Sequence, residues 1–233
     1  MEKYGIIGAM ESEVKELGEQ LQNKEITEYA GLSFMTGFLV GKNVVIVKSG
    51  IGKVNAALCA QALILKFGVT AVINTGIAGA LRSGLKVFDF VISTAAVYHD
   101  FDTTAFGYKI GQVPGMVEQF KADDKLCELA FTAFEQTEFA KNHMAVKGLI
   151  ASGDQFISDS KQKKTIQSNF EPACVEMEGA AIAHACHLNN IPFVIVRCMS
   201  DMADETVEQT YSFNEDICAG ASACLVRKII ELA

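Results

Sequence analysis

The 233-residue sequence lacks the features of membrane, disordered and disulfide-stapled proteins. It has three prolines, is half hydrophobic and contains no run of eighteen apolar residues, so neither disorder nor a membrane span is expected. No basic segment followed by an apolar one opens the chain, so we expect no signal peptide. The seven cysteines form no Cys-x-x-Cys pair, which favours reduced thiols in a cytoplasmic protein over disulfides or structural zinc.

Positive charge is also scarce. The formal net charge is −8, whereas a nucleic-acid partner would require a basic face, so no such partner is expected. Arginine occurs at only three positions, 82, 197 and 227, and none of them lies in the glycine-containing turns around Gly8, Ser49 or Gly76. Phosphate sites commonly use several arginines, so the sequence disfavours phosphate as a reactant.

The glycine pair Gly50–Gly52 suggests a phosphate-binding loop, but the motif is incomplete. Val47 and Val54 stand where a Walker A loop requires Gly and Ser or Thr, and Asn55 replaces the third Gly of the dinucleotide fingerprint. A tight turn into a helix is therefore the better interpretation.

Metal ligation is disfavoured as well. The two histidine-containing segments, 99–102 and 184–187, have no partner cluster at a recognised ligand spacing. We therefore expect no metal site.

Continuous apolar runs alternate with helix-length segments, which predicts an α/β protein. No linker or repeat interrupts the pattern, so residues 1–233 are expected to form a single domain with a central mixed β-sheet flanked by helices on both faces. The expected strands are Tyr4–Ala9, Leu32–Leu39, Asn43–Lys48, Thr70–Asn74, Asp89–Tyr98, Ala145–Ser152, one beginning at Cys174, and Pro192–Met199. The expected helices are Met10–Leu21, Lys53–Phe67, Asp123–Gln136, Ser160–Asn169, Gly179–Leu188 and one from about Phe213.

Small, polar or acidic residues follow six of these predicted strands. In α/β sheets, ligands bind beyond the carboxyl ends of the strands, so we expect these residues to meet at one crevice. The segments concerned are Ala9–Glu11, Ser49–Gly52, Thr75–Gly79, Ser152–Asp154, Glu176–Glu178 and Ser200–Asp201.

Two acidic residues at these strand ends, Glu176 and Glu178, are two positions apart. Strand alternation puts both carboxylates on one side, where burial is costly unless they are paired or used. Glu178 also precedes the predicted helix Gly179–Leu188 and could cap it. The helix N-terminus would then keep Glu178 ionised and able to accept hydrogen bonds from sugar hydroxyls.

Two further acids have both an ordinary and a catalytic interpretation. Glu13 suits the dipole of the first helix, but beside the crevice it could also accept a proton from water. Asp201 could be a turn residue or an N-cap, but its neighbours Met199 and Met202 would raise its pKa and suit it to donate a proton. Two carboxyl groups with separate roles fit hydrolysis at an anomeric carbon, without naming the leaving group.

Motifs along the whole chain resemble those of the 5′-methylthioadenosine/S-adenosylhomocysteine nucleosidases. The resemblance runs from about residue 4 to the C-terminal helix, and two positions depart from it: Ile77, where Ser is common, and Gln155, where a small residue is common. The matching segments are Gly5–Val14, Lys48–Ala57, Asn74–Gly79, Thr104–Tyr108, Ser152–Ile157, Val175–Glu178 and Val196–Asp201.

The resemblance implies a cofactor-independent homodimer that hydrolyses the N-glycosidic bond of adenine thionucleosides. Asp201 would protonate adenine N7, Ser200 would orient Asp201, and Glu13 would activate water. Met177 and Glu178 would hold the ribose, with Glu176 touching or supporting the same hydroxyl network. The remaining implied substrate contacts are the adenine-site residues Phe156 and Ile157, main-chain groups of Ala78 and Gly79, the 5′-alkylthio pocket residues Met10, Ile51 and Phe213, and Phe106 and Pro114 from a partner subunit.

Three alternatives remain. A phosphate-dependent purine nucleoside phosphorylase would share the fold but need cationic groups, and Lys53 is the one basic residue near such a turn, while Glu13 would repel phosphate. A futalosine-type hydrolase would differ in the 5′ substituent that it accepts. A non-enzymatic adenine-nucleoside binding protein would not need both an acid and a base.

Overall fold

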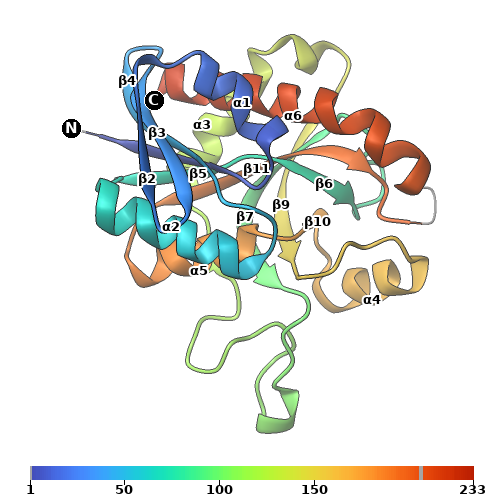
Figure 1. The fold of residues 1–233 in the computed structure, drawn as a ribbon. Coiled ribbons are helices and arrows are strands. Elements are labelled where there is room, and N and C mark those ends of the chain that lie inside the picture. Colours follow the sequence, from blue (N-terminus) through green and yellow to red (C-terminus); the bar gives the residue numbers. More distant parts are fainter. Residues whose placement is uncertain (1, 205–206) are drawn as a thin grey trace.

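The computed structural model describes residues 2–204 and 207–233, and only the backbone of residues 207–213. Its strands form one mixed sheet in the order β2-β3-β4-β1-β5-β11-β6-β10-β9-β7-β8, with helices on both faces, as the sequence predicts (Figure 1). The strands are β1 (Tyr4–Gly8), β2 (Gln22–Tyr29), β3 (Leu32–Leu39), β4 (Lys42–Lys48), β5 (Ala71–Asn74), β6 (Ile77–Ala80), β7 (Phe90–Tyr98), β8 (Phe120–Lys121), β9 (Ala145–Ser152), β10 (Cys174–Glu176) and β11 (Phe193–Asp201).

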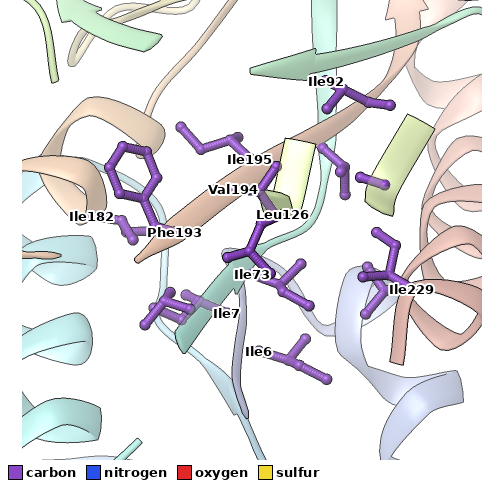
Figure 2. Close-up of a cluster of buried hydrophobic side chains, with 14 of the residues drawn as sticks. Ile6, Ile7, Ile73, Ile92, Leu126, Ile182, Phe193, Val194, Ile195 and Ile229 are labelled. Carbon is purple, nitrogen blue, oxygen red and sulfur yellow. The ribbon is translucent and has the colours of Figure 1, made fainter. Parts of the chain in front are cut away.

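One half of the sheet is an open parallel layer. Strand β1 pairs in parallel with β4 and β5, and the first residues of β11 pair in parallel with β5. These strands are continuous apolar runs because both of their faces are covered by helices. Figure 2 shows the resulting core, in which Ile6, Ile73 and Val194 are fully buried.

The other half of the sheet curls into a closed ring that includes β11. Residues 196–198 of β11 pair antiparallel with β7, and its last residues pair in parallel with β6. Strands β6, β10, β9 and β7 complete the ring through their own pairings. The β6–β11 register shifts between Met199 and Asp201, and such an irregularity re-aims the side chains at a strand end.

The helices lie in two groups. Helices α1 (Glu11–Glu19), α3 (Asp124–Glu135) and α6 (Val207–Leu232) pack together on one face of the sheet, and α2 (Lys53–Phe67) and α5 (Gly179–Leu188) cover the other (Figure 1). Helix α4 (Ser160–Phe170) lies apart from both groups, beyond β10. Among the described residues, no helix is both long and apolar enough to cross a membrane.

The segment between β7 and β8 projects from the body of the molecule (Figure 1). It carries a short 3₁₀ helix, η1 (Thr104–Phe106), near its tip. Phe106 is 80% exposed and Pro114 is also exposed, so neither side chain is packed within its own chain.

Three strands and one helix start differ from the prediction. Every residue of β2 is exposed, so it carries no apolar alternation, and β8 is only two residues long. Strand β6 lies in what looked like a glycine-rich turn, since Ala78 and Gly79 allow it to pack close to the end of β11. Helix α6 begins at Val207, whereas the prediction placed its start near Phe213. The prediction missed the first turns because they are polar in sequence.

Candidate active site

One pocket lies where β1, β10 and β11 end beside β6, and it gathers the predicted site. The space between its lining residues, open mouth included, is about 550 Å³. Of the predicted site residues whose side chains the structure describes, all but Phe106 and Pro114 line it. The lining residues are Ala9, Met10, Glu13, Ile51, Ile77, Ala78, Gly79, Gln155, Phe156, Ile157, Val175, Glu176, Met177, Glu178, Ser200 and Asp201.

Glu13 is a buried carboxylate held by backbone N–H groups. Its Oε2 accepts hydrogen bonds from the N–H groups of Ala9 (2.6 Å) and Met10 (3.0 Å), and its Oε1 accepts one from Ile77 (3.2 Å). Burial raises its pKa, while Arg197 and these three donors oppose the rise. A buried carboxylate with a raised pKa that still lines a pocket is suited to accept a proton. Its bond to Met10 N–H also caps α1, which agrees with the helix-terminus interpretation.

The approach of Glu13 to the β5–β6 connection requires a glycine. Gly76 has φ of 156°, and a Cβ atom there would lie 2.6 Å from Glu13 Oε1. Because that φ is nearly extended, lack of space rather than backbone strain excludes a larger residue. Gly76 therefore lets the carboxylate reach Ile77 N–H.

Asp201 ends β11 and is nearly buried. Its Oδ2 accepts the Ser200 hydroxyl (2.7 Å), and its Oδ1 accepts Ala203 N–H (2.8 Å). Burial raises its pKa, as the sequence predicts, although the Ser200 and Ala203 bonds act in the opposite direction. The group is thus fixed in orientation and disposed to hold a proton.

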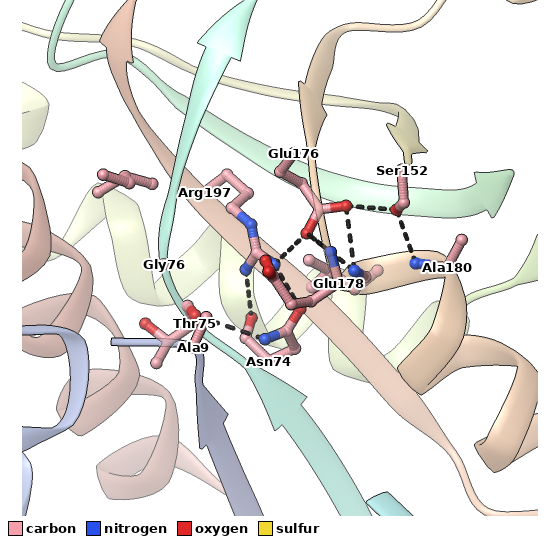
Figure 3. A network of polar contacts seen from close by, with 12 residues as sticks. Ala9, Asn74, Thr75, Gly76, Ser152, Glu176, Glu178, Ala180 and Arg197 are labelled. Carbon is pink, nitrogen blue, oxygen red and sulfur yellow. Dashed lines mark hydrogen bonds and ion pairs between the residues drawn. The ribbon is translucent and has the colours of Figure 1, made fainter. Parts of the chain in front are cut away.

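Glu176 and Arg197 form a buried ion pair at the centre of a polar network (Figure 3). Their Oε2 and Nη2 atoms lie 2.5 Å apart, and the two side chains are 3% and 2% exposed. Glu176 also accepts the N–H groups of Glu178 and Gly179 and the Ser152 hydroxyl. Its oxygens are thus engaged by the protein, even though the residue lines the pocket.

Arg197 and Asn74 are parts of the site that the sequence analysis missed. Arg197 Nη2 donates to Asn74 Oδ1 at 2.5 Å, and Asn74 Nδ2 donates to the carbonyl of Ile7 at 3.0 Å. The available signal was the position of Arg197 within the apolar strand Phe193–Asp201, because a buried cation requires a buried anion or acceptors.

Glu178 faces the pocket with fewer protein partners. Its Oε1 accepts Gly52 N–H at 2.8 Å, which connects the end of β10 to the turn before α2. Burial, followed by the nearby Glu176 carboxylate, raises its pKa to about 8, whereas Gly52 N–H and Arg197 oppose the rise. The capping role is wrong, since Glu178 makes no side-chain cap bond and Glu176 accepts Gly179 N–H instead.

The other lining residues form an apolar wall around these acids. Ile157 is 4% exposed, whereas Phe156 and Ile51 are about half exposed at 51% and 53% and lie at the mouth. Gly79 leaves room for Asp201, because a Cβ atom there would lie 2.9 Å from Asp201 Oδ1. The side chain of Phe213 lies outside the described residues.

Several cations around the pocket are engaged by protein groups, including Lys163, which acts on the pKa of Asp201 and lies 3.6 Å from Asp204. Lys53 Nζ lies 2.6 Å from both carboxylate oxygens of Asp100, Arg197 is paired with Glu176, and Arg82 Nη1 donates to the Lys147 carbonyl. No group of three His, Cys, Asp or Glu in the described part of the chain is arranged to hold a metal.

Sequence comparison places the chain among known enzymes. The model of the phosphorylase superfamily matches residues 3–231. A 5′-methylthioadenosine/S-adenosylhomocysteine nucleosidase from Bacillus cytotoxicus is 47% identical over 214 residues, which cover 91% of this chain and 90% of the relative.

Solved structures of similar proteins agree. The nucleosidase of Colwellia psychrerythraea, in complex with adenine, is 45% identical with a TM-score of 0.95, covering 99% of this chain and 96% of its own. That of Neisseria meningitidis, with methylthio-immucillin-A, is 41% identical with a TM-score of 0.95 and 99% coverage of both chains. A futalosine hydrolase of Helicobacter pylori is 31% identical, with a TM-score of 0.93 and 99% coverage of both. All residues that line the pocket lie within residues 3–231, the range that the family model matches. The chain belongs to the phosphorylase superfamily and, within it, to the 5′-methylthioadenosine/S-adenosylhomocysteine nucleosidase family.

Proposed function

We propose that this protein hydrolyses the N-glycosidic bond of 5′-methylthioadenosine and S-adenosylhomocysteine, and also of 5′-deoxyadenosine. The products would be adenine and the 5-thioribosyl compound, or 5-deoxyribose from 5′-deoxyadenosine. The observation that carries the proposal is that two buried carboxyl groups line one pocket from different elements. Glu13 lies in the first turn of α1, just after β1, and Asp201 lies at the end of β11. One can activate water while the other donates a proton to the leaving base.

Asp201 is proposed as the general acid that protonates adenine N7. Protonation makes the base a better leaving group, and a carboxyl group with a raised pKa is disposed to supply that proton. The Ser200 hydroxyl fixes the orientation of Asp201 by donating to Oδ2.

Glu13 is proposed as the general base toward the attacking water. Its three N–H donors fix the carboxylate in place, and its raised pKa improves its capacity to accept a proton. The same negative charge would oppose a phosphate nucleophile at that position.

Glu178 and Met177 are proposed to hold the ribose, with Glu178 accepting its hydroxyls. A carboxylate at that position would also stabilise an oxocarbenium-like transition state. Glu176 is already bonded to Arg197, Ser152 and Gly179. We therefore propose that it supports Glu178 and does not contact the ribose hydroxyls directly.

The apolar wall is proposed to bind the two ends of the substrate. Phe156 would stack on adenine, and the main chains of Ile157, Ala78 and Gly79 would contact the base and sugar. The 5′-alkylthio group would lie against Met10, Ile51 and Phe213, since a thioether suits an apolar surface. Ile77 adds an apolar side chain to this wall, and its backbone N–H donates to Glu13 Oε1.

We also propose a homodimer in which Phe106 and Pro114 of one subunit complete the 5′ pocket of the other. Val54, Leu58 and Leu65 of α2 are 70%, 64% and 73% exposed, although large apolar side chains are usually covered. Val54 and Leu58 are four residues apart and therefore share one helix face. A second subunit would cover this face.

A cytoplasmic role in methionine salvage and in removal of methyl-transfer by-products follows from the proposed substrates. Phosphorolysis is less well supported because Lys53, Arg82 and Arg197 are engaged by protein groups. Futalosine-type hydrolysis is the second candidate, favoured by the 31% identity to a futalosine hydrolase. The 5′ substituent accepted would distinguish the two hydrolases, and adenine release would exclude a protein that only binds nucleosides.

Replacement of Glu13 should remove most of the activity without unfolding the protein. Glu13→Gln keeps the side-chain size but cannot accept a proton, so kcat should fall about 10²–10⁴-fold. Glu11→Gln is the matched control, since Glu11 lies in the same turn and its ion pair with Lys48 is exposed. Steady-state adenine release and circular dichroism of both variants check this, and a near-normal rate for Glu13→Gln would remove it from the role.

Adenine release should proceed at full rate in phosphate-free buffer, because water is the proposed nucleophile. The assay would measure the free base, which is adenine from methylthioadenosine, adenosylhomocysteine, 5′-deoxyadenosine and adenosine and hypoxanthine from inosine and futalosine, with and without added phosphate. A strict requirement for phosphate would identify a phosphorylase, and a preference for futalosine would identify the second hydrolase.

Charges on the exposed face of α2 should separate the proposed dimer. The double substitution Val54→Asp and Leu58→Asp should change the sedimenting mass from about twice 25.1 kDa to the mass of one chain. Met144→Asp, at a half-exposed position outside α2, is the control and should stay dimeric. A monomeric unmodified protein, or a double variant that still dimerises, would refute this interface.

A further inference from the structure

Lys53, the first residue of α2, connects the turn before α2 to the segments that follow β7 and β9. Its Nζ lies 2.6 Å from both oxygens of Asp100, which follows β7, and 3.6 Å from Asp154, which follows β9. Its backbone N–H donates to Asp154 Oδ1 at 2.8 Å. Asp154 N–H in turn donates to Asp100 Oδ2 at 2.8 Å, so the three residues form a closed set, the Lys53 cluster.

The Lys53 cluster is half shielded from water, which distinguishes it from an ordinary surface ion pair. The side chains of Lys53 and Asp100 are 21% and 15% exposed, and Lys53 Nζ lies 5.5 Å from the centre of the Tyr98 ring. Burial would raise the pKa of Asp100, but hydrogen bonds from Lys53 and Asp154 N–H hold that pKa below its usual value. Removal of the ammonium group would leave a poorly solvated carboxylate without its cation.

Each member of the cluster begins or ends a segment of the proposed site. Lys53 follows the turn that contains Ile51 and Gly52, and Asp154 precedes the wall residues Phe156 and Ile157. Asp100 begins the projecting segment that carries Phe106. The turn before Lys53 uses φ angles of 82° at Gly50 and 98° at Gly52, so its shape depends on what anchors its ends.

Gly52 transmits this anchoring to the proposed ribose site. Its N–H donates to Glu178 Oε1 at 2.8 Å, and Lys53 is the next residue in the chain. The other groups that act on Glu178 are the charges of Glu176, Arg197 and Glu13. The Gly52 hydrogen bond is thus the contact of Glu178 that comes from outside the central polar network.

We propose that Lys53 is a positioning residue that holds Gly52 N–H against Glu178 by clamping the turn to Asp100 and Asp154. The kinetic part of this proposal rests on the proposed nucleosidase function, since it assumes that Glu178 holds the ribose. Loss of the clamp weakens substrate binding at the sugar, while Glu13 and Asp201 keep their own partners.

The test uses Lys53→Met, which keeps the length of the side chain but removes its charge, and Lys53→Arg, which can still pair with Asp100. Lys147→Met is the matched control. Lys147 is similarly part-buried, its Nζ lies 2.5 Å from Glu128 and 4.8 Å from the centre of the Phe131 ring, and it is absent from the pocket lining.

The first readout is amide hydrogen exchange of the peptide that contains Gly52, which needs no activity. Exchange should accelerate about tenfold or more in Lys53→Met, the effect of losing one hydrogen bond to a charged group, and should stay unchanged in Lys53→Arg and Lys147→Met. Unchanged exchange in Lys53→Met would overturn the proposal.

The second readout is steady-state hydrolysis of methylthioadenosine. KM should rise about tenfold in Lys53→Met with kcat changed less than about threefold, and Lys53→Arg should restore it. An equal change in Lys147→Met, or a loss confined to kcat, would overturn the assigned role. An unmodified protein that releases no adenine would instead refute the proposed function, and the exchange experiment would still decide the position of Gly52.

Discussion

The buried pair of Arg197 and Glu176 is the interaction on which the rest of the site depends. It joins β11 to β10 within the ring of strands, and through Asn74 it also joins β5 (Figure 3). Removal of one partner from such a pair leaves an uncompensated buried charge and typically costs about 3–5 kcal/mol. The segments that carry Glu13, Glu178 and Asp201 are therefore held in one arrangement by an ion pair that is itself buried.

The Arg197–Glu176 pair also gives the neighbouring carboxyl groups of Glu176 and Glu178 different surroundings. Glu176 is engaged by Arg197, Ser152 and the first N–H groups of α5, so Glu178 is left facing the pocket with one protein donor, Gly52. Burial and the neighbouring Glu176 carboxylate raise the pKa of Glu178, while Gly52 N–H and Arg197 act in the opposite direction. Ligand hydroxyl groups that donate hydrogen bonds to Glu178 would favour its charged form.

The sequence predicted the parts of the fold that follow from burial and spacing. The strand Ala145–Ser152 and the helices Lys53–Phe67 and Gly179–Leu188 have the predicted bounds, since apolar periodicity and flanking glycines define them. It did not predict β2, whose residues are all exposed, or the closure of β11 onto β7, which is a long-range pairing. The sequence also predicted that the strand-end residues meet at one site, as they do. It did not predict the contacts of Arg197 and Lys53, because their partners are distant in sequence.

The central claim is that Asp201 donates a proton to the leaving base, and its pH dependence tests this most directly. An acid must be protonated to act, so kcat/KM of the unmodified protein should fall as the pH rises through the pKa of Asp201, which burial raises. Asp201→Asn should lower kcat/KM about 10²–10⁴-fold and lose this alkaline decline, with the fold retained by circular dichroism. A near-normal rate in Asp201→Asn with the same alkaline decline would contradict the account.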